Sequence, residues 1–167
     1  ESFDLAESLQ TPVIMLTDLD LGMNDHMSPP FIWDDTRAFK RGKVLNESDL
    51  ESATSWGRYT DVDGDGVAYR TLPGTHPTKG SYFTRGSSHD EKANYSEDSD
   101  TYVRIMNRLL KKFESAKNLV PRPDFYQETN QSDTGIIFFG TTRYSAEEAL
   151  DILESQERKT DAIRIKA

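Results

Sequence analysis

The sequence predicts an α/β fold in which each end of the chain carries only part of a sheet. Two observations support this prediction. A helix leads directly into an apolar strand near the N-terminus, and a strand–helix–strand unit stands near the C-terminus. A helix that joins two strands is typical of parallel sheets, because parallel strands need a crossover connection. We therefore expect further strands of both sheets on either side of these residues.

The first element is expected over residues 1–10, where apolar residues recur at helical spacing. Pro12 ends this helix, because its ring cannot continue a helix. The apolar run at residues 13–16 predicts a short buried strand. This order of helix and strand is the second half of a β-α-β unit, whose first strand is expected upstream.

The middle of the chain is expected to be largely irregular. A short helix should begin at Asn46, because a capping residue is followed there by acidic residues. Residues 61–90 are rich in Gly, Asp, Thr and Ser, which predicts a long functional or interface loop. A strong amphipathic helix is expected over about residues 99–119, with Tyr102, Met106, Leu109, Leu110, Phe113 and Ala116 on its apolar face. The proline-marked, polar residues 121–133 are expected to form an interdomain linker.

The C-terminal part predicts one complete β-α-β unit. An apolar strand is expected at residues 135–139 and a second strand at residues 161–165. Between them, Ser145 and Glu148 have the spacing of a capping box, which predicts a helix that begins at Ser145. We therefore divide the chain into one domain over residues 1–120, the linker, and a second domain over residues 134–167.

The composition excludes several classes of function. The formal net charge is −9 and the sequence pI is about 4.8, which disfavours nucleic-acid binding, because that function needs clustered cations. The chain has no cysteine, so it forms no disulfide, ligates no iron–sulfur cluster and has no catalytic thiolate. No apolar run reaches the roughly 20 residues that a membrane span requires. The expected location is the cytoplasm, without contact to a membrane.

An acidic loop contains a candidate metal site. Asp61, Asp63 and Asp65 follow the spacing with which an EF-hand calcium loop begins, but its twelfth position is Leu72 and not a glutamate. One interpretation is a divalent-ion site formed by these three carboxylates. The alternative, which we favour, is an acidic turn whose glycines adopt positive φ angles.

Residues 73–86 form the most informative segment. Their hydroxyl, imidazole and cationic side chains belong to the types that hold a carboxylate or phosphate. The candidate residues of this substrate or interface loop are Thr75, His76, Lys79 and Arg85. The alternative is a surface loop that packs on a neighbouring subunit through Tyr82 and Phe83.

Together, several stretches resemble one family, the α subunits of 2-oxoacid:ferredoxin oxidoreductases. The resemblance is most specific in GRYTDVDGDGVAYRTLPGTHPTKGSYFTRG at residues 57–86. The other similar stretches are TPVIMLTDLDLGMND at 11–25, SPPF at 28–31, RGKVL at 41–45, SED at 96–98, VPRP at 120–123 and GIIFFGTT at 135–142. The closest branch is the 2-oxoglutarate type. The resemblance implies that residues 1–120 end a pyrimidine-binding domain of the thiamine diphosphate fold. Residues 134–167 would then begin a transketolase-C-like domain.

The resemblance also implies an activity, the oxidative decarboxylation of a 2-oxoacid to an acyl-CoA with electrons passed to ferredoxin. Thiamine diphosphate and magnesium would lie between the α subunit and a β subunit that carries a [4Fe–4S] cluster. The family's Tyr-Pro-Ile-Thr-Pro motif has no counterpart in this chain, so no catalytic residue is assigned. We expect these residues to hold no cofactor and to be inactive by themselves. The alternative function is an acidic, metal-stabilised binding or scaffold module built on the loop Asp61–Asp65.

Overall fold

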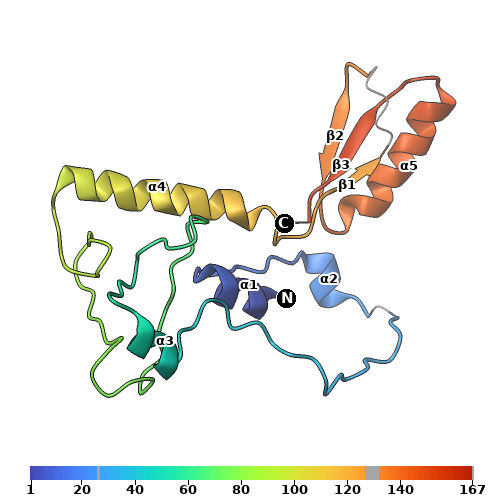
Figure 1. Cartoon of the computed structure of the whole chain (residues 1–167). Helices are drawn as coiled ribbons and strands as arrows, with labels where there is room; N and C mark the ends of the chain where they lie inside the picture. Colours follow the sequence, from blue (N-terminus) through green and yellow to red (C-terminus); the bar gives the residue numbers. More distant parts are fainter. Residues whose placement is uncertain (26, 127–131, 167) are drawn as a thin grey trace. The chain divides into compact units, whose positions relative to one another are not determined.

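The computed structural model describes residues 1–25, 27–126 and 132–166 as two compact units. Unit 1 comprises residues 1–14 and 36–119, and unit 2 comprises residues 15–35 and 120–167. Figure 1 labels the helices and strands of both units. The architecture is mixed α/β, as the sequence predicts, with one small sheet among the described residues.

Unit 1 contains three helices joined by long irregular segments. Helix α1 (Ser2–Leu9) confirms the first predicted element and ends at Gln10, which adopts a left-handed conformation. The Gln10 amide then donates to the carbonyl of Ala68 at 2.5 Å and so ties α1 to residues 53–98, the irregular segment that we call the central loop. Helix α3 (Glu47–Ser52) begins at Asn46, whose side chain accepts from a backbone N–H of the first turn in a capping box.

The third helix of unit 1, α4 (Ser99–Ala116), is the longest of the described residues and begins at a typical cap. The Asp98 carboxylate accepts from the backbone N–H of Thr101 at 2.8 Å. The face of α4 that is buried differs from the face that its apolar residues predict. Thr101, Ile105 and Lys112 are buried, whereas Leu110 and Phe113 are more than half exposed.

The segment between α3 and α4 is irregular, as predicted for residues 61–90. Within its described residues it contributes only single bridges, such as the pairing of Val44 with Arg70. Gly66 is buried in this segment at a φ of +82°, and its carbonyl accepts from the Arg108 guanidinium of α4 at 2.8 Å. The loop is thus held in place by contacts to the helix and not by a sheet.

Unit 2 contains the predicted β-α-β unit. Strand β2 (Gly135–Phe138) runs parallel to β3 (Asp161–Arg164), and helix α5 (Thr142–Ser155) connects them. A further strand, β1 (Asp124–Tyr126), pairs antiparallel with β3, which gives the sheet order β1-β3-β2. Helix α5 packs on one face of this sheet (Figure 1). The core between them contains Phe138, Ala146, Leu150 and Ala162.

The predicted start of α5 at Ser145 is wrong, because the helix already begins at Thr142. Its N-terminus is stabilised by a distant residue. The Asp18 carboxylate accepts from the backbone N–H of Thr141 at 2.8 Å and from its hydroxyl at 2.9 Å. Asp18 also caps the short helix α2 (Leu19–Met23) by accepting from Leu21 N–H. One carboxylate therefore joins the starts of two helices of unit 2.

Two other predictions need correction or stay open. Residues 13–16 form no strand. A strand needs a neighbouring strand to pair with its backbone, and none of the described strands pairs with this segment, in which Ile14, Met15 and Leu16 are 81%, 78% and 87% exposed. The predicted linker contains β1, and residues 127–131 lie outside the described residues, as does residue 167. The predicted domain boundaries stay a prediction.

The sheet of unit 2 carries apolar side chains on the face opposite α5. Phe125 and Ile137 lie at register positions on either side of Ile163, and they are 60% and 73% exposed. Within the described part of the chain, no helix is both long and apolar enough to cross a membrane. This finding agrees with the absence of a long apolar run in the sequence.

Candidate functional site

The main pocket of unit 1 lies between α4, the end of α1 and two stretches of the central loop. Its volume is about 190 Å³. One side has apolar walls, which include Val67, Ile105 and Leu109. Polar groups complete the lining: Gln10, Arg58, Tyr59, Ser87, Ser88, His89, Arg108 and Lys112. No carboxylate of the described residues is among the lining groups.

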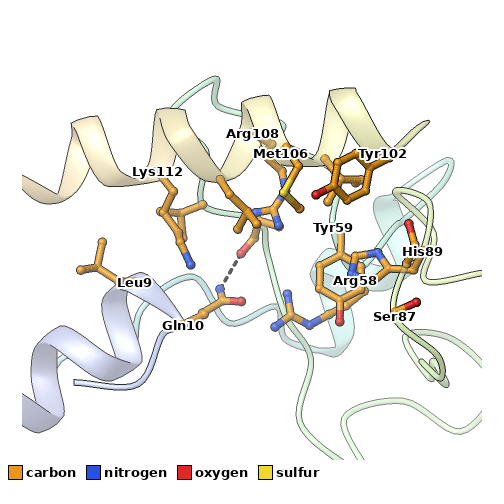
Figure 2. A pocket seen from close by; sticks show the side chains of 15 residues that line it. Leu9, Gln10, Arg58, Tyr59, Ser87, His89, Tyr102, Met106, Arg108 and Lys112 are labelled. Atoms are coloured by element: carbon orange, nitrogen blue, oxygen red, sulfur yellow. Dashed lines mark hydrogen bonds between the residues drawn. The ribbon is translucent and has the colours of Figure 1, made fainter. Parts of the chain in front are cut away.

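Three cations converge on this pocket from opposite sides. Arg108 and Lys112 are one helical turn apart, so α4 places both on the same face. Figure 2 shows them reaching toward the space that Arg58 and Gln10 approach from the other side. Arg58 comes from the irregular segment that precedes the acidic loop. The pocket therefore concentrates positive charge in a chain whose formal net charge is −9.

Lys112 is the most unusual of these cations, because its side chain is 7% exposed. Its ammonium donates to the hydroxyl of Thr11. Burial lowers the pKa of Lys112, and the positive charges of Arg108 and Arg58 lower it further. A buried lysine without a carboxylate partner is rare, since transfer of a charge out of water is costly.

The two arginines are also incompletely satisfied. Burial lowers the pKa of Arg108, and the charge of Arg58 adds to this effect, while the Asp61 carboxylate partly compensates it. The Nε–H groups of Arg58 and Arg108 are both buried and have no hydrogen-bond partner among the described residues. Such groups ordinarily find an acceptor, because an unpaired buried donor costs about 1–3 kcal/mol.

An aromatic pair forms another wall of the pocket. Tyr59 and His89 are stacked with their ring centroids 3.8 Å apart. Both arginines lie over the Tyr59 ring, with the Arg58 guanidinium carbon 5.0 Å and that of Arg108 5.7 Å from the centroid. His89 Nδ1 lies 3.0 Å from the carbonyl oxygen of Asp90, so this nitrogen carries the proton. The contacts with the Tyr59 ring orient both arginines, but they leave the Nε–H groups of the arginines without a hydrogen-bond partner among the described residues.

The predicted loop residues lie outside this pocket and have local partners. The Thr75 hydroxyl donates to the carbonyl of Leu72 at 2.8 Å, within one turn. His76 Nδ1 accepts from the backbone N–H groups of Thr78 and Lys79 at 3.1 and 2.9 Å. These contacts shape the loop, and a role in binding stays a prediction for both side chains.

The two predicted cations of the loop differ from each other. The Lys79 ammonium donates to the carbonyls of Leu50 and Glu51 at 3.0 and 3.3 Å, at the C-terminal end of α3. Arg85 is exposed. The structure thus does not bring the four predicted loop residues together around one pocket.

The acidic loop is organised around Lys43. Its ammonium lies 2.6 Å from Asp63 and 2.8 Å from Asp65. Burial opposes the charged form of Lys43, but the hydrogen bonds to these carboxylates outweigh it and raise its pKa. Asp61 instead accepts from the backbone N–H of Gly66 at 3.0 Å. Among the described residues, no group of three or more acidic or histidine side chains is arranged to hold a metal ion. A metal site at Asp61, Asp63 and Asp65 stays a prediction.

The residues of the main pocket were not predicted as a site. Arg108 and Lys112 do give one signal, since their spacing by four places them in a helical stripe with Ile105 and Leu109. Cations inside an apolar stripe are unusual and mark a candidate site. The contribution of Arg58 has no such signal, because it depends on how the central loop folds against α4.

Comparisons with known proteins find relatives of one kind. No protein-family model matches the chain. The 2-oxoacid:ferredoxin oxidoreductase 1 subunit alpha of Sulfurisphaera tokodaii is 28% identical over 145 residues, which are 84% of this chain. The subunit alpha of a 2-oxoacid:ferredoxin oxidoreductase from a Sulfolobus species matches equally well. In both cases the match covers 21% of the relative, so the chain spans about a fifth of the length of these proteins.

A solved structure shows the same fold. It is a 2-oxoglutarate:ferredoxin oxidoreductase from Magnetococcus marinus with 2-oxoglutarate, coenzyme A and succinyl-CoA bound. The TM-score is 0.73 at 21% identity, over 98% of this chain and 27% of that one. The chain is therefore similar to 2-oxoacid:ferredoxin oxidoreductase α subunits, which confirms the resemblance stated from its residues.

Proposed function

We propose that this chain forms part of a 2-oxoacid:ferredoxin oxidoreductase α subunit in an enzyme that uses 2-oxoglutarate. The enzyme would decarboxylate the 2-oxoacid oxidatively, form an acyl-CoA and pass the electrons to ferredoxin. The observation that carries the proposal is the similarity of fold over 98% of the chain. The preference for 2-oxoglutarate is supported by the substrate named for that neighbour.

In this proposal, the chain supplies binding surfaces and leaves the cofactor chemistry to other parts of the enzyme. A chain without cysteine cannot ligate the [4Fe–4S] cluster, which would belong to a β subunit. The acidic loop also does not fit the magnesium ion that accompanies thiamine diphosphate, since the ammonium of Lys43 already contacts Asp63 and Asp65. Thiamine diphosphate would therefore be held elsewhere at the contact with the β subunit. The 167 residues would be inactive by themselves.

The domain assignment follows from the same proposal. Residues 1–120 would close a pyrimidine-binding domain, and residues 134–167 would open a transketolase-C-like domain. The loop with Thr75, His76 and Lys79 would then face a substrate or the neighbouring subunit. The exposed position of much of this loop is compatible with either role.

Reconstitution tests the proposed function. A complete α subunit that contains this chain, assembled with its β partner, is expected to reduce an artificial electron acceptor when both 2-oxoglutarate and coenzyme A are present. Omission of coenzyme A is the matched control and should abolish sustained turnover. Absence of turnover with every 2-oxoacid supplied would refute the proposal. Faster turnover with another 2-oxoacid would refute only the preference for 2-oxoglutarate.

A further inference from the structure

We propose that the cationic pocket of unit 1 binds a phosphate group. The inference depends on the geometry of the pocket and not on the proposed function. Arg58, Arg108 and the buried Lys112 line the pocket, with no carboxylate of the described residues among its lining groups, and the buried Nε–H groups of both arginines have no hydrogen-bond partner among the described residues. We call these three side chains the cation triad.

The described residues that line the pocket offer the triad no opposite charge. Arg58 and Arg108 are close enough to disfavour the charged form of Lys112, and each of the three is at least partly removed from water. Asp61 is the carboxylate that acts on Arg108, but it does not line the pocket. A bound anion would reverse this repulsion, because opposite charges attract strongly where water is scarce.

A phosphate group suits this set of donors better than a carboxylate. A phosphate presents three or four acceptor oxygens in a tetrahedral arrangement and carries up to two negative charges. The triad approaches from opposite sides (Figure 2), and Ser87 and Ser88 are among the residues that line the same space. A single carboxylate offers two oxygens in one plane and one charge, so it would leave part of the triad unpaired.

The size of the pocket points to the same class of ligand. Its 190 Å³ correspond to roughly six water molecules at about 30 Å³ each. A phosphate group fits into this space, whereas drug-sized ligands need about 300–1,000 Å³. The stacked rings of Tyr59 and His89 form a rigid wall beside it. The ligand is accordingly inorganic phosphate or the phosphate end of a larger molecule.

Calorimetric titration of the full chain with inorganic phosphate tests the inference. Chloride at the same ionic strength controls for screening of the net charge. Phosphate is expected to bind and to raise the melting temperature, while acetate should bind at least tenfold more weakly. Absence of binding by phosphate, or tighter binding of acetate, would overturn the inference. A phosphate monoester that binds more tightly than free phosphate would identify the larger molecule as the source of the ligand.

Two substitutions on the same helix separate binding from folding. Lys112→Met removes a cation of the triad and keeps a flexible apolar side chain of similar length. It should weaken phosphate binding by about tenfold or more, since a hydrogen bond to a charged group contributes about 1.5–3 kcal/mol. Lys111→Met removes the neighbouring exposed cation, which does not line the pocket, and should leave the Kd within about twofold.

A second readout excludes a purely structural role of Lys112. Without phosphate, Lys112→Met should raise the melting temperature, because the substitution ends the repulsion from Arg58 and Arg108. The same variant should show a smaller rise than the wild type when phosphate is added. Equal losses of phosphate affinity in the Lys111 and Lys112 variants would contradict the proposed site.

Discussion

Two glycines of the acidic loop offer a sharp test of how this loop is held against α4. Gly64 and Gly66 both have positive φ angles, +73° and +82°. A Cβ atom on Gly66 would lie 2.2 Å from the backbone nitrogen of Lys112 and 2.6 Å from the carbonyl oxygen of Arg108. A Cβ atom on Gly64 would meet only the end of the flexible Lys111 side chain, at 3.5 Å. Gly64→Ala therefore measures the cost of the backbone conformation alone.

The expected magnitudes follow from this difference. A left-handed conformation costs an L-residue about 1–2 kcal/mol, and the stiffer unfolded chain returns about 0.4–1 kcal/mol. Gly64→Ala should thus lower the free energy of unfolding by roughly 1 kcal/mol. Gly66→Ala adds a collision with helix backbone, which cannot rotate away, and overpacking of this kind costs about 1–3 kcal/mol more. We expect a total loss of about 2–4 kcal/mol for Gly66→Ala.

Urea denaturation followed by tryptophan fluorescence measures both variants. The chain has two tryptophans, and Trp33→Phe leaves Trp56 as the reporter of unit 1. The midpoint of Gly66→Ala should fall below that of Gly64→Ala by about 1 M urea, at a slope of about 1–3 kcal/mol per molar urea. Equal midpoints would refute the close packing of Gly66 on α4. They would also remove the support for the positions of Arg108 and Lys112 in the pocket.

Three further predictions concern charged residues. Asp18→Asn should destabilise unit 2. Hydrogen bonds from Leu21 and then Thr141 lower the pKa of Asp18, so the extra stability of the wild type over this variant should disappear as the pH falls below 3.8. Circular-dichroism melts at a series of pH values measure this difference. The lowered pKa of Lys112 means that the unfolded chain binds more protons in the alkaline range, so thermal stability should rise toward pH 10.5 in the wild type and less so in Lys112→Met. Calcium at millimolar concentration should leave the melting temperature unchanged, because the Lys43 ammonium already contacts both Asp63 and Asp65; a clear rise would instead favour the metal-stabilised module.

Sequence patterns within a few positions correctly predicted the helices and strands whose formation depends on neighbouring residues. The short helix at Asn46 and the strands on either side of α5 follow from capping residues and apolar runs within a few positions. The true start of α5 could not be found in this way, because its stabilising carboxylate, Asp18, lies 123 positions away in the sequence. The same limit explains β1, which forms only because β3 offers it an edge.

The pocket was missed for a related reason. Sequence analysis places apolar residues inside and cations outside, and this rule holds for Ile105 but fails for Lys112. The rule also assigned Phe113 to the buried side, whereas it is 56% exposed. The inward stripe of α4 contains Arg108 and Lys112 because the central loop, with Arg58, folds against it. Such a site depends on tertiary contacts that the apolar pattern does not encode.

The sheet of unit 2 provides the last prediction, since two neighbouring residues of β2 face opposite sides. Phe138 is 5% exposed and packs in the core beneath α5, whereas Ile137 is 73% exposed on the other face. Phe138→Ala should cost about 3–5 kcal/mol through the cavity that it leaves. Ile137→Ser should change the stability of this chain by no more than about 0.5 kcal/mol, because it exchanges one exposed side chain for another.

Comparable losses in both variants, measured by thermal melting of the chain, would contradict a sheet that is covered on one face only. The same pair is informative in the complete enzyme that the proposed function requires. A substantial cost of Ile137→Ser there, but not in the chain alone, would show that the face with Phe125 and Ile163 is covered in the enzyme. The comparison therefore measures how far the architecture of unit 2 depends on surroundings that the 167 residues do not provide.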